Sequence, residues 1–277
     1  MTDSNESPTS AAAQAVAQLV KEVPVYQDAV QPAAQQLGRG LGGLLAYMML
    51  PLQKLGIKAE VNIAQFKKEY EDKLIEIPND KLIPPDPIIM GPALQALTYT
   101  VQEPLLRKMF VNLLAAASNA DSSDKAHPSF VEIIKQLKPV EAKLVDIFRD
   151  EVRLPMLTIS RADKNGGMTA VQYTLIEAAL AGDSLLDYSV ELDNLERLKI
   201  INIKTDSSFT NENKYDKIVS ALLQIFPHLV KYEYEVYRNF QEGEFRGVYR
   251  LGIIEITKFG QDFISACCAP EDDTLNS

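Results

Sequence analysis

The chain has 277 residues, of which 46% are hydrophobic and 24% are charged, as in ordinary globular proteins. This composition excludes a mostly disordered, collagenous or disulfide-stapled chain, and the two cysteines are neighbours, Cys267 and Cys268, which gives no sign of an oxidising compartment. With 28 basic against 38 acidic residues the net charge is −10, so the overall field repels nucleic acid and anionic lipid. We therefore expect a soluble, cytoplasmic protein without a nucleic-acid partner.

The N-terminal residues lack the basic start and apolar core of a secretory signal. We expect a flexible tail and short helix over residues 1–20 and an acidic tail over 269–277. Between these tails the pattern predicts two domains, a helical domain over 21–150 and a winged-helix-like α+β domain over 151–268 with an enlarged wing insertion. The expected fold class is mainly α.

The stretch from Gly40 to Gln53 contains no charged residue over fourteen positions. As a helix it would extend about 21 Å, which is short of the roughly 30 Å hydrocarbon core of a bilayer. Small residues four positions apart let two helices approach closely, in membranes and in soluble cores alike. Two interpretations stay open, a buried packing helix and a membrane-active segment, and both depend on Gly38, Gly42, Leu45, Met48 and Met49.

Helical patterns continue up to residue 150, and no strand is expected in this half. Residues 60–76 mix apolar and charged positions, which is typical of an exposed amphipathic helix. Five prolines between residues 78 and 92 predict an extended, turn-rich connector. Pro104 suits the first turn of the helix with the strongest apolar periodicity. Two shorter amphipathic helices are expected around 130–137 and 140–148.

After residue 150 the pattern changes to a mixture of strands and helices. A strand-like run at 156–159 is followed by the turn signal Asn165-Gly166-Gly167. Apolar periodicity predicts one helix over 171–179 and another over 185–195, joined by a tight turn at Gly182. Two helices joined in this way are typical of a helix-turn-helix.

The remaining elements complete the winged-helix pattern. Strands are expected at 200–203 and 252–256, with an extra helix between them inside residues 214–240. A closing helix is expected after Thr257, whose hydroxyl is a suitable N-cap. Its apolar face would bury Cys267 as an unreactive, small hydrophobic side chain.

The expected second helix of this motif has the wrong charge for DNA. Residues 183–198 contain five acidic residues and Arg197 as the single basic one, whereas a helix that binds DNA must bring cations and amides to phosphates and bases. We therefore favour a winged helix retained for protein contact. Acidic and aromatic side chains here and in the insertion form a candidate partner surface, with an ordinary solvated face as the alternative: Asp187, Glu191, Tyr232 and Tyr234.

The residues that usually carry catalysis are scarce in this chain. It has two histidines, and His127 is the candidate for chemistry, although Asp124 and Ser129 beside it are explained more simply as helix-capping groups. Two histidines and two adjacent cysteines do not provide a usual zinc site, and the glycine-rich run at 38–43 lacks the lysine of a phosphate-binding loop. We expect no enzyme, no cofactor and no metal, while an active site of scattered carboxylates stays open.

Three blocks of sequence resemble the bacterial abortive infection alpha family. They are PVYQD at 24–28 with QPAAQQLGRGLG at 31–42 and LPL at 50–52, then IIMGPALQALTY at 88–99 with EPLLRKMFVNLLA at 103–115, and HPSFVEIIKQL at 127–137. The resemblance implies anti-phage defence in which infection leads to growth arrest or death of the host cell. It brings no catalytic residues to these positions.

Three mechanisms are compatible with this resemblance. In the favoured one, the protein is a non-enzymatic switch in the cytoplasm that responds to a phage or host protein. In the second, the helix at 37–52 is released, forms homo-oligomers through Gly38 and Gly42, and inserts into the inner membrane. The third is a winged-helix regulator that binds DNA.

Overall fold

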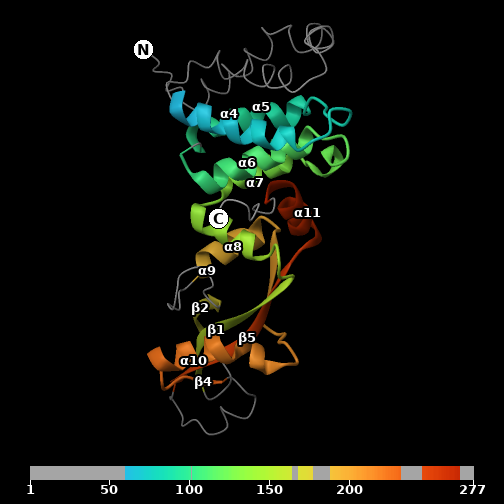
Figure 1. The fold of residues 1–277 in the computed structure, drawn as a ribbon. Coiled ribbons are helices and arrows are strands. Elements are labelled where there is room, and N and C mark those ends of the chain that lie inside the picture. The colour runs from blue at the N-terminus through green and yellow to red at the C-terminus, as the bar shows by residue number, and fades with distance from the viewer. Residues whose placement is uncertain (1–59, 101, 164–167, 177–187, 232–244, 269–277) are drawn as a thin grey trace, which may run out of the picture.

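The computed structural model describes residues 60–100, 102–163, 168–176, 188–231 and 245–268. Within these ranges the fold is α+β, with layered helices at one end and a long twisted sheet at the other (Figure 1). The predicted tails, the segment containing Gly38 and Gly42, and the turn at Gly182 lie outside the described residues.

The first described helices form the layers from the upper part to the middle of Figure 1. They are α4 (Glu60–Ile75), α5 (Pro87–Thr100), α6 (Pro104–Ala117), α7 (Ser129–Gln136) and α8 (Pro139–Ile147). Both α4 and α5 pack against α6, whose apolar face is buried between them and the rest of the protein. The helices predicted from amphipathic spacing at 60–76, 104–117, 130–137 and 140–148 are confirmed, and α6 starts at Pro104 as expected.

The prediction that residues 78–92 form an extended connector is wrong for its last part, because α5 begins at Pro87 and contains Pro92. Pro87 occupies the first turn, where no backbone N–H is needed. The Asp86 carboxylate accepts a hydrogen bond from the N–H of Ile88 at 2.9 Å and caps the helix. Burial of Ile89 and neighbouring apolar side chains then outweighs the hydrogen bond lost at Pro92.

The sheet has the strand order β2-β1-β5-β3, all antiparallel, and the short β4 pairs in parallel with β5. The strands are β1 (Arg153–Asp163), β2 (Met168–Ile176), β3 (Ile201–Lys204), β4 (Val230–Lys231) and β5 (Phe245–Ile256). The predicted strands at 156–159, 200–203 and 252–256 are therefore confirmed, and two of them are longer than expected.

The predicted helix over 171–179 is wrong, because residues up to Ile176 form β2 and pair with β1 from Ala162↔Met168 to Met156↔Ile176. This segment is rich in β-branched and aromatic residues, which suit a strand next to a long partner. The following helix, α9 (Ser189–Arg197), confirms part of the prediction for 185–195. The pair of helices expected for a helix-turn-helix is consequently not formed by these two segments.

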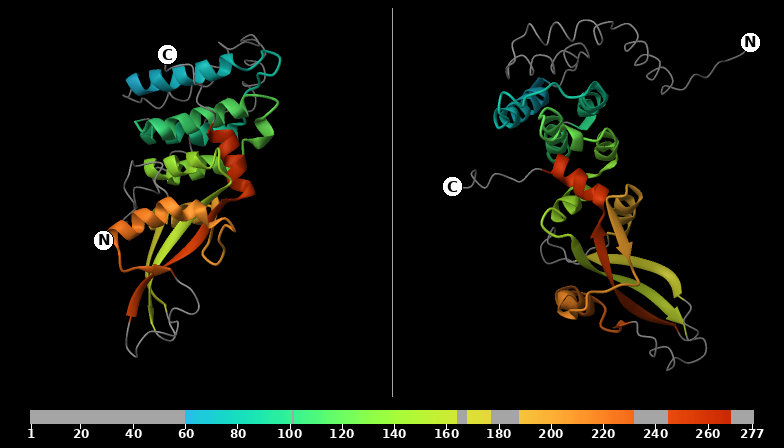
Figure 2. Two further views of the ribbon diagram at one scale, coloured as in Figure 1. Left: turned by 60° about the horizontal axis from the view of Figure 1, so that its bottom comes forward. Right: turned by 90° about the vertical axis from the view of Figure 1, so that its right-hand side faces the viewer.

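The rest of the second half follows the prediction more closely. The extra helix inside the insertion is present as η3 (Glu212–Tyr215) followed by α10 (Asp216–Ile225), which lies along one face of the sheet (Figure 2). The closing helix α11 (Lys258–Cys267) begins after Thr257, whose hydroxyl accepts a hydrogen bond from the N–H of Gly260 at 2.8 Å. Glycine is required there, because a Cβ at position 260 would collide with the carbonyl oxygen of Ile200.

Two apolar clusters hold the described part of the chain together. The larger one is continuous from α4 through α6, α8, α9 and α11 to the near end of the sheet. The smaller one lies under α10 at the far half of the sheet and contains Leu157, Tyr215, Ile218, Leu222 and Tyr249. Among the described helices, none combines the length and apolar character that a bilayer crossing requires.

Candidate functional site

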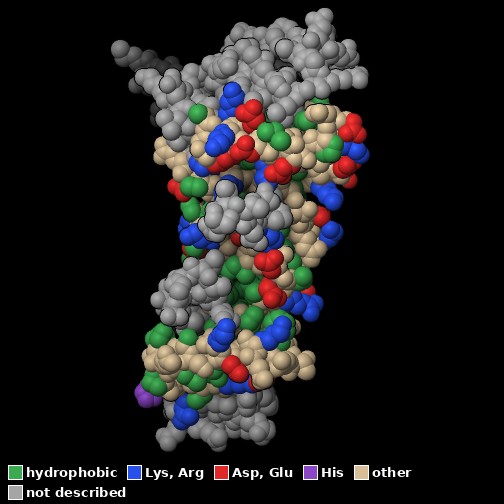
Figure 3. All heavy atoms as spheres, viewed as in Figure 1, with side chains coloured by type: hydrophobic (Ala, Val, Ile, Leu, Met, Phe, Trp, Pro, Cys, Tyr) green, Lys and Arg blue, Asp and Glu red, His purple; other side chains and the backbone are tan. Residues whose placement is uncertain are grey.

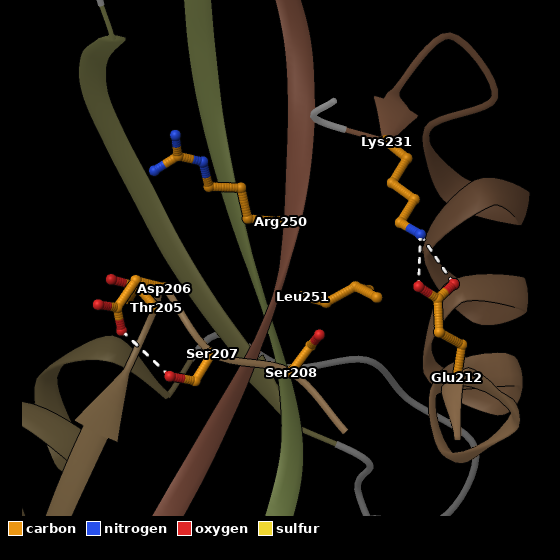
Figure 4. Close-up of a pocket in the computed structure, with 8 residues that line it drawn as sticks. All are labelled: Thr205, Asp206, Ser207, Ser208, Glu212, Lys231, Arg250 and Leu251. Carbon is orange, nitrogen blue, oxygen red and sulfur yellow. Dashed lines mark hydrogen bonds and ion pairs between the residues drawn. The ribbon is translucent and has the colours of Figure 1, made fainter. Parts of the chain in front are cut away.

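A polar pocket of about 320 Å³ lies at the edge of the far half of the sheet (Figure 4). On this edge β3 pairs with β5 as far as Lys204↔Ile253, and β4 pairs with β5 at Val248 and Tyr249. The pocket occupies the interval between these two strand ends. Its lining consists of Thr205, Asp206, Ser207, Ser208, Glu212, Lys231, Arg250 and Leu251.

The charges that line this pocket are balanced. Lys231 donates to both carboxylate oxygens of Glu212, at 2.9 and 2.8 Å, and the pair forms one wall in Figure 4. Arg250 and Asp206 lie on the other side, where the Ser207 hydroxyl donates to Asp206 at 3.4 Å. Two cations and two carboxylates favour a polar ligand without a large net charge over a phosphate-rich one.

A buried tyrosine holds the loop beside the pocket in place. The hydroxyl of Tyr215 donates to the carbonyl oxygen of Gly252 at 2.9 Å and accepts from the N–H of Phe209 at 3.1 Å. Burial raises the pKa of Tyr215, so this hydroxyl stays protonated at neutral pH and keeps its donor role. The loop from β3 to η3 is thereby tied to the middle of β5.

The candidate for chemistry, His127, lies at the start of α7 and is exposed to solvent. Its Nδ1 lies 2.6 Å from the Ser129 hydroxyl and accepts from the Ser129 N–H at 3.1 Å. The ring also packs beside Phe130 and Phe259. Within the described chain no carboxylate bonds to this ring, and its hydrogen bonds join it to Ser129, the first residue of α7.

Two polar side chains of α9 bond to the neighbouring helices. Asn194 donates to the Glu141 carboxylate at 3.0 Å, and Arg197 donates to the side-chain oxygens of Gln136 and Asn194 at 2.9 and 2.7 Å. Glu141 is 1% exposed and also caps α8 by accepting from the N–H of Lys138 at 2.7 Å. The single cation of α9 thus connects this helix to α7.

The outer side of α9 is mixed in character. Val190 is 66% exposed, Asp193 and Arg197 are exposed, and Glu191 is partly exposed. The other members of the candidate partner surface, Asp187, Tyr232 and Tyr234, lie outside the described residues, as do Leu45, Met48 and Met49. That the members of the candidate partner surface lie together therefore stays a prediction.

Ion pairs join distant elements elsewhere in the structure. Glu255 on β5 bonds to Arg153 on β1 and to Lys204 on β3, and these bonds lower its pKa. Arg107 on α6 makes a two-pronged contact with Glu69 on α4, at 2.9 Å for each bond. Basic and acidic side chains are interspersed over the helical layers on the face shown in Figure 3.

Cys267 and Cys268 are buried at the end of α11, and burial raises the pKa of both thiols, that of Cys268 to about 12. The expectation of a buried Cys267 is confirmed, since this residue belongs to the large apolar cluster. Among the side chains that the structure describes, no three of His, Cys, Asp or Glu converge as metal ligands would.

Sequence reasoning missed the pocket and the Glu141 network. The pocket combines residues from 205 to 251, so no local motif announces it. The Glu141 network did leave a signal, because Lys-Pro-Val-Glu at 138–141 places a glutamate at the third position of a helix that starts with proline.

A family model described as abortive infection alpha matches residues 58–267. This range includes the blocks at 88–115 and 127–137 and also the C-terminal half, where the sequence alone showed little resemblance, while the block at 24–52 precedes it. No curated protein and no solved structure matches the chain. Because the match covers most of the chain, the protein belongs to the abortive infection alpha family.

Proposed function

We propose that this protein serves in anti-phage defence as a contact-driven switch in the cytoplasm. In this proposal a phage or host protein binds to it, and the resulting change leads to growth arrest or death of the infected cell without catalysis by the protein. Membership of the abortive infection alpha family supports the defence role.

The charges of α9 are the observation that carries the mechanism. Arg197, the single cation of the helix, is exposed but bonds to the side chains of Gln136 and Asn194. The exposed side of α9 therefore combines Val190, Asp193 and a cation that is already hydrogen-bonded, which suits contact with a protein better than contact with phosphate. The charge-matched pocket at the sheet edge agrees with this preference.

A phage challenge tests the defence role. We expect cells that express the protein to reduce phage plating by at least about tenfold for some members of a diverse phage panel, and infected cells to stop growing before progeny are released. Equal plating with and without the protein across the panel would contradict the proposal.

A matched pair of surface variants tests whether the outer face of α9 is used. Val190→Arg should restore plating, because it places a charge where a partner packs, whereas Val152→Arg should not. Val152 is a suitable control, because it is 55% exposed and lies outside α9. The same variant can be tested for binding to duplex DNA. Salt-sensitive binding by Val190→Arg but not by the wild type would show that the wild-type charge pattern disfavours DNA.

A further inference from the structure

Helix α5 presents an uncharged outer face. The helix has fourteen residues, PIIMGPALQALTYT, and none of them is charged. Its inner face is buried in the large cluster, but Ile88 on the outer face is 60% exposed. A surface helix normally carries charged residues on its outer side, so this face is unusual for one that meets water alone.

Another segment could approach the same face of α5 closely. A Cβ at Gly91 would meet no other atom within 4 Å, so space is free directly beside the helix backbone. Pro92 follows it and has no N–H, so the carbonyl of Ile88 lacks its donor in the next turn. Ile88, Gly91 and Pro92 together offer a small apolar surface with one backbone acceptor, next to the exposed, uncharged side chain of Gln95.

We propose that residues 40–53 of the same chain pack along this face of α5 in the resting protein. This segment lies outside the described residues, and like α5 it has fourteen residues and no charge. As a helix it would extend about 21 Å, the length of α5. An uncharged helix of this length would be suited to cover α5, and Gly42, with Gly38 just before the segment, would permit close packing.

The chain connection favours this occupant. Residues 54–59 lead from the segment to Glu60 at the start of α4 and can span at most about 20 Å. Helices α4 and α5 both pack on α6 and lie side by side in Figures 1 and 2. The segment can therefore reach α5 from the start of α4 without rearrangement of the described helices.

The size of the face argues against a second copy as the occupant. One side of a 21 Å helix is far smaller than the roughly 800 Å² per partner that a stable complex buries. A tethered segment needs much less area, because the short connection keeps its effective concentration near the millimolar range. The inference rests on the proposed function in one respect, because it names the contact that would hold the switch in its resting state.

Cysteine cross-linking of the purified full chain tests the contact in the absence of phage, so its outcome is independent of the defence role. Gly91→Cys is combined in turn with a cysteine at Leu41, Leu45, Met48 or Met49, and Leu45→Cys with Ser220→Cys on α10 is the control. The native thiols give little background, because both are buried and their pKa values are raised. We expect a disulfide within one chain for at least one Gly91 pair and none for the control.

Limited trypsin digestion provides the second measurement, at Lys54 and Lys58 in the connection. Ile88→Glu should speed cleavage there by at least about tenfold while the melting temperature stays within a few degrees, because Ile88 contributes little to the described core. Ile225→Glu, at a residue 55% exposed on α10, should leave cleavage unchanged. Absence of any cross-link within one chain, cross-links between chains only, or equal cleavage of both variants would overturn the proposal.

Discussion

The helical end and the far half of the sheet are stabilised in different ways. At the helical end one continuous apolar cluster includes a stacked Phe66–Tyr70 pair and the Phe130 ring between Phe259 and Phe263. The far half has a small cluster under α10 and the hydrogen bonds of Tyr215. A region with few buried contacts can open without global unfolding, so we expect the pocket region to change shape independently of the helices.

The largest expected effect breaks the helical end. Phe110→Ala removes a side chain with 0% exposure from the centre of α6 and should lower the free energy of unfolding by about 4 kcal/mol. Urea denaturation followed by circular dichroism measures this loss. A loss below about 1 kcal/mol would show that the large cluster is not the main source of stability.

The second prediction separates the two regions. Leu222→Ala leaves a cavity in the small cluster and should lower the free energy of unfolding by about 2 to 3 kcal/mol. We expect this loss to be confined to α10 and the adjoining part of β5. Hydrogen exchange with mass spectrometry should show faster exchange there and unchanged protection of α6. Equal loss of protection at both ends would mean that the two regions unfold as one unit.

A smaller effect is expected from Tyr215→Phe, which removes the hydroxyl between Gly252 and Phe209. Leaving the Gly252 carbonyl and the Phe209 N–H without this partner should cost about 1 to 2 kcal/mol. Hydrogen exchange at the Phe209 amide should be faster than in the wild type, and this rate is the measurement that tests the role of the bond. Unchanged exchange at Phe209 would show that the loop does not depend on this bond.

The smallest effect depends on pH and concerns the ion pairs of Glu255. Bonds from Lys204 and Arg153 lower the pKa of Glu255 in the folded protein. The carboxylate therefore stabilises the fold at neutral pH, and this contribution is lost as the pH falls through the pKa of the folded state. Glu255→Gln should cost at most about 1 kcal/mol at pH 7. The difference between variant and wild type should shrink once the pH falls below about 4, and a constant difference would contradict the assignment.

The sequence predicted those helices whose signals are local. In α6, Pro104 and the apolar spacing act together, and in α11 the Thr257 cap precedes an apolar face. It failed where tertiary partners decide the outcome. Val171 and Ile176 fit a helical spacing, but pairing with β1 makes this segment a strand, and burial keeps α5 helical despite Pro92.

The candidate site was harder to predict than the fold. The structure places the exposed His127 beside Ser129, but Ser129 is the first residue of α7 and this helix has no side-chain N-cap bond, so the expected capping by Ser129 is wrong. The pocket depends on where β3 stops along β5, and a strand end of this kind has no signature in residue spacing. The resemblance to the family came from strings of residues, and it could not show which surface is used.

The most direct test of a contact-driven switch compares the protein recovered from infected and from uninfected cells by limited trypsin digestion. The account predicts that infection by a phage to which the protein responds exposes Lys54 and Lys58 to cleavage, while α6 and the large apolar cluster stay protected. Identical digestion patterns before and after infection, in cells where plating is reduced, would contradict it.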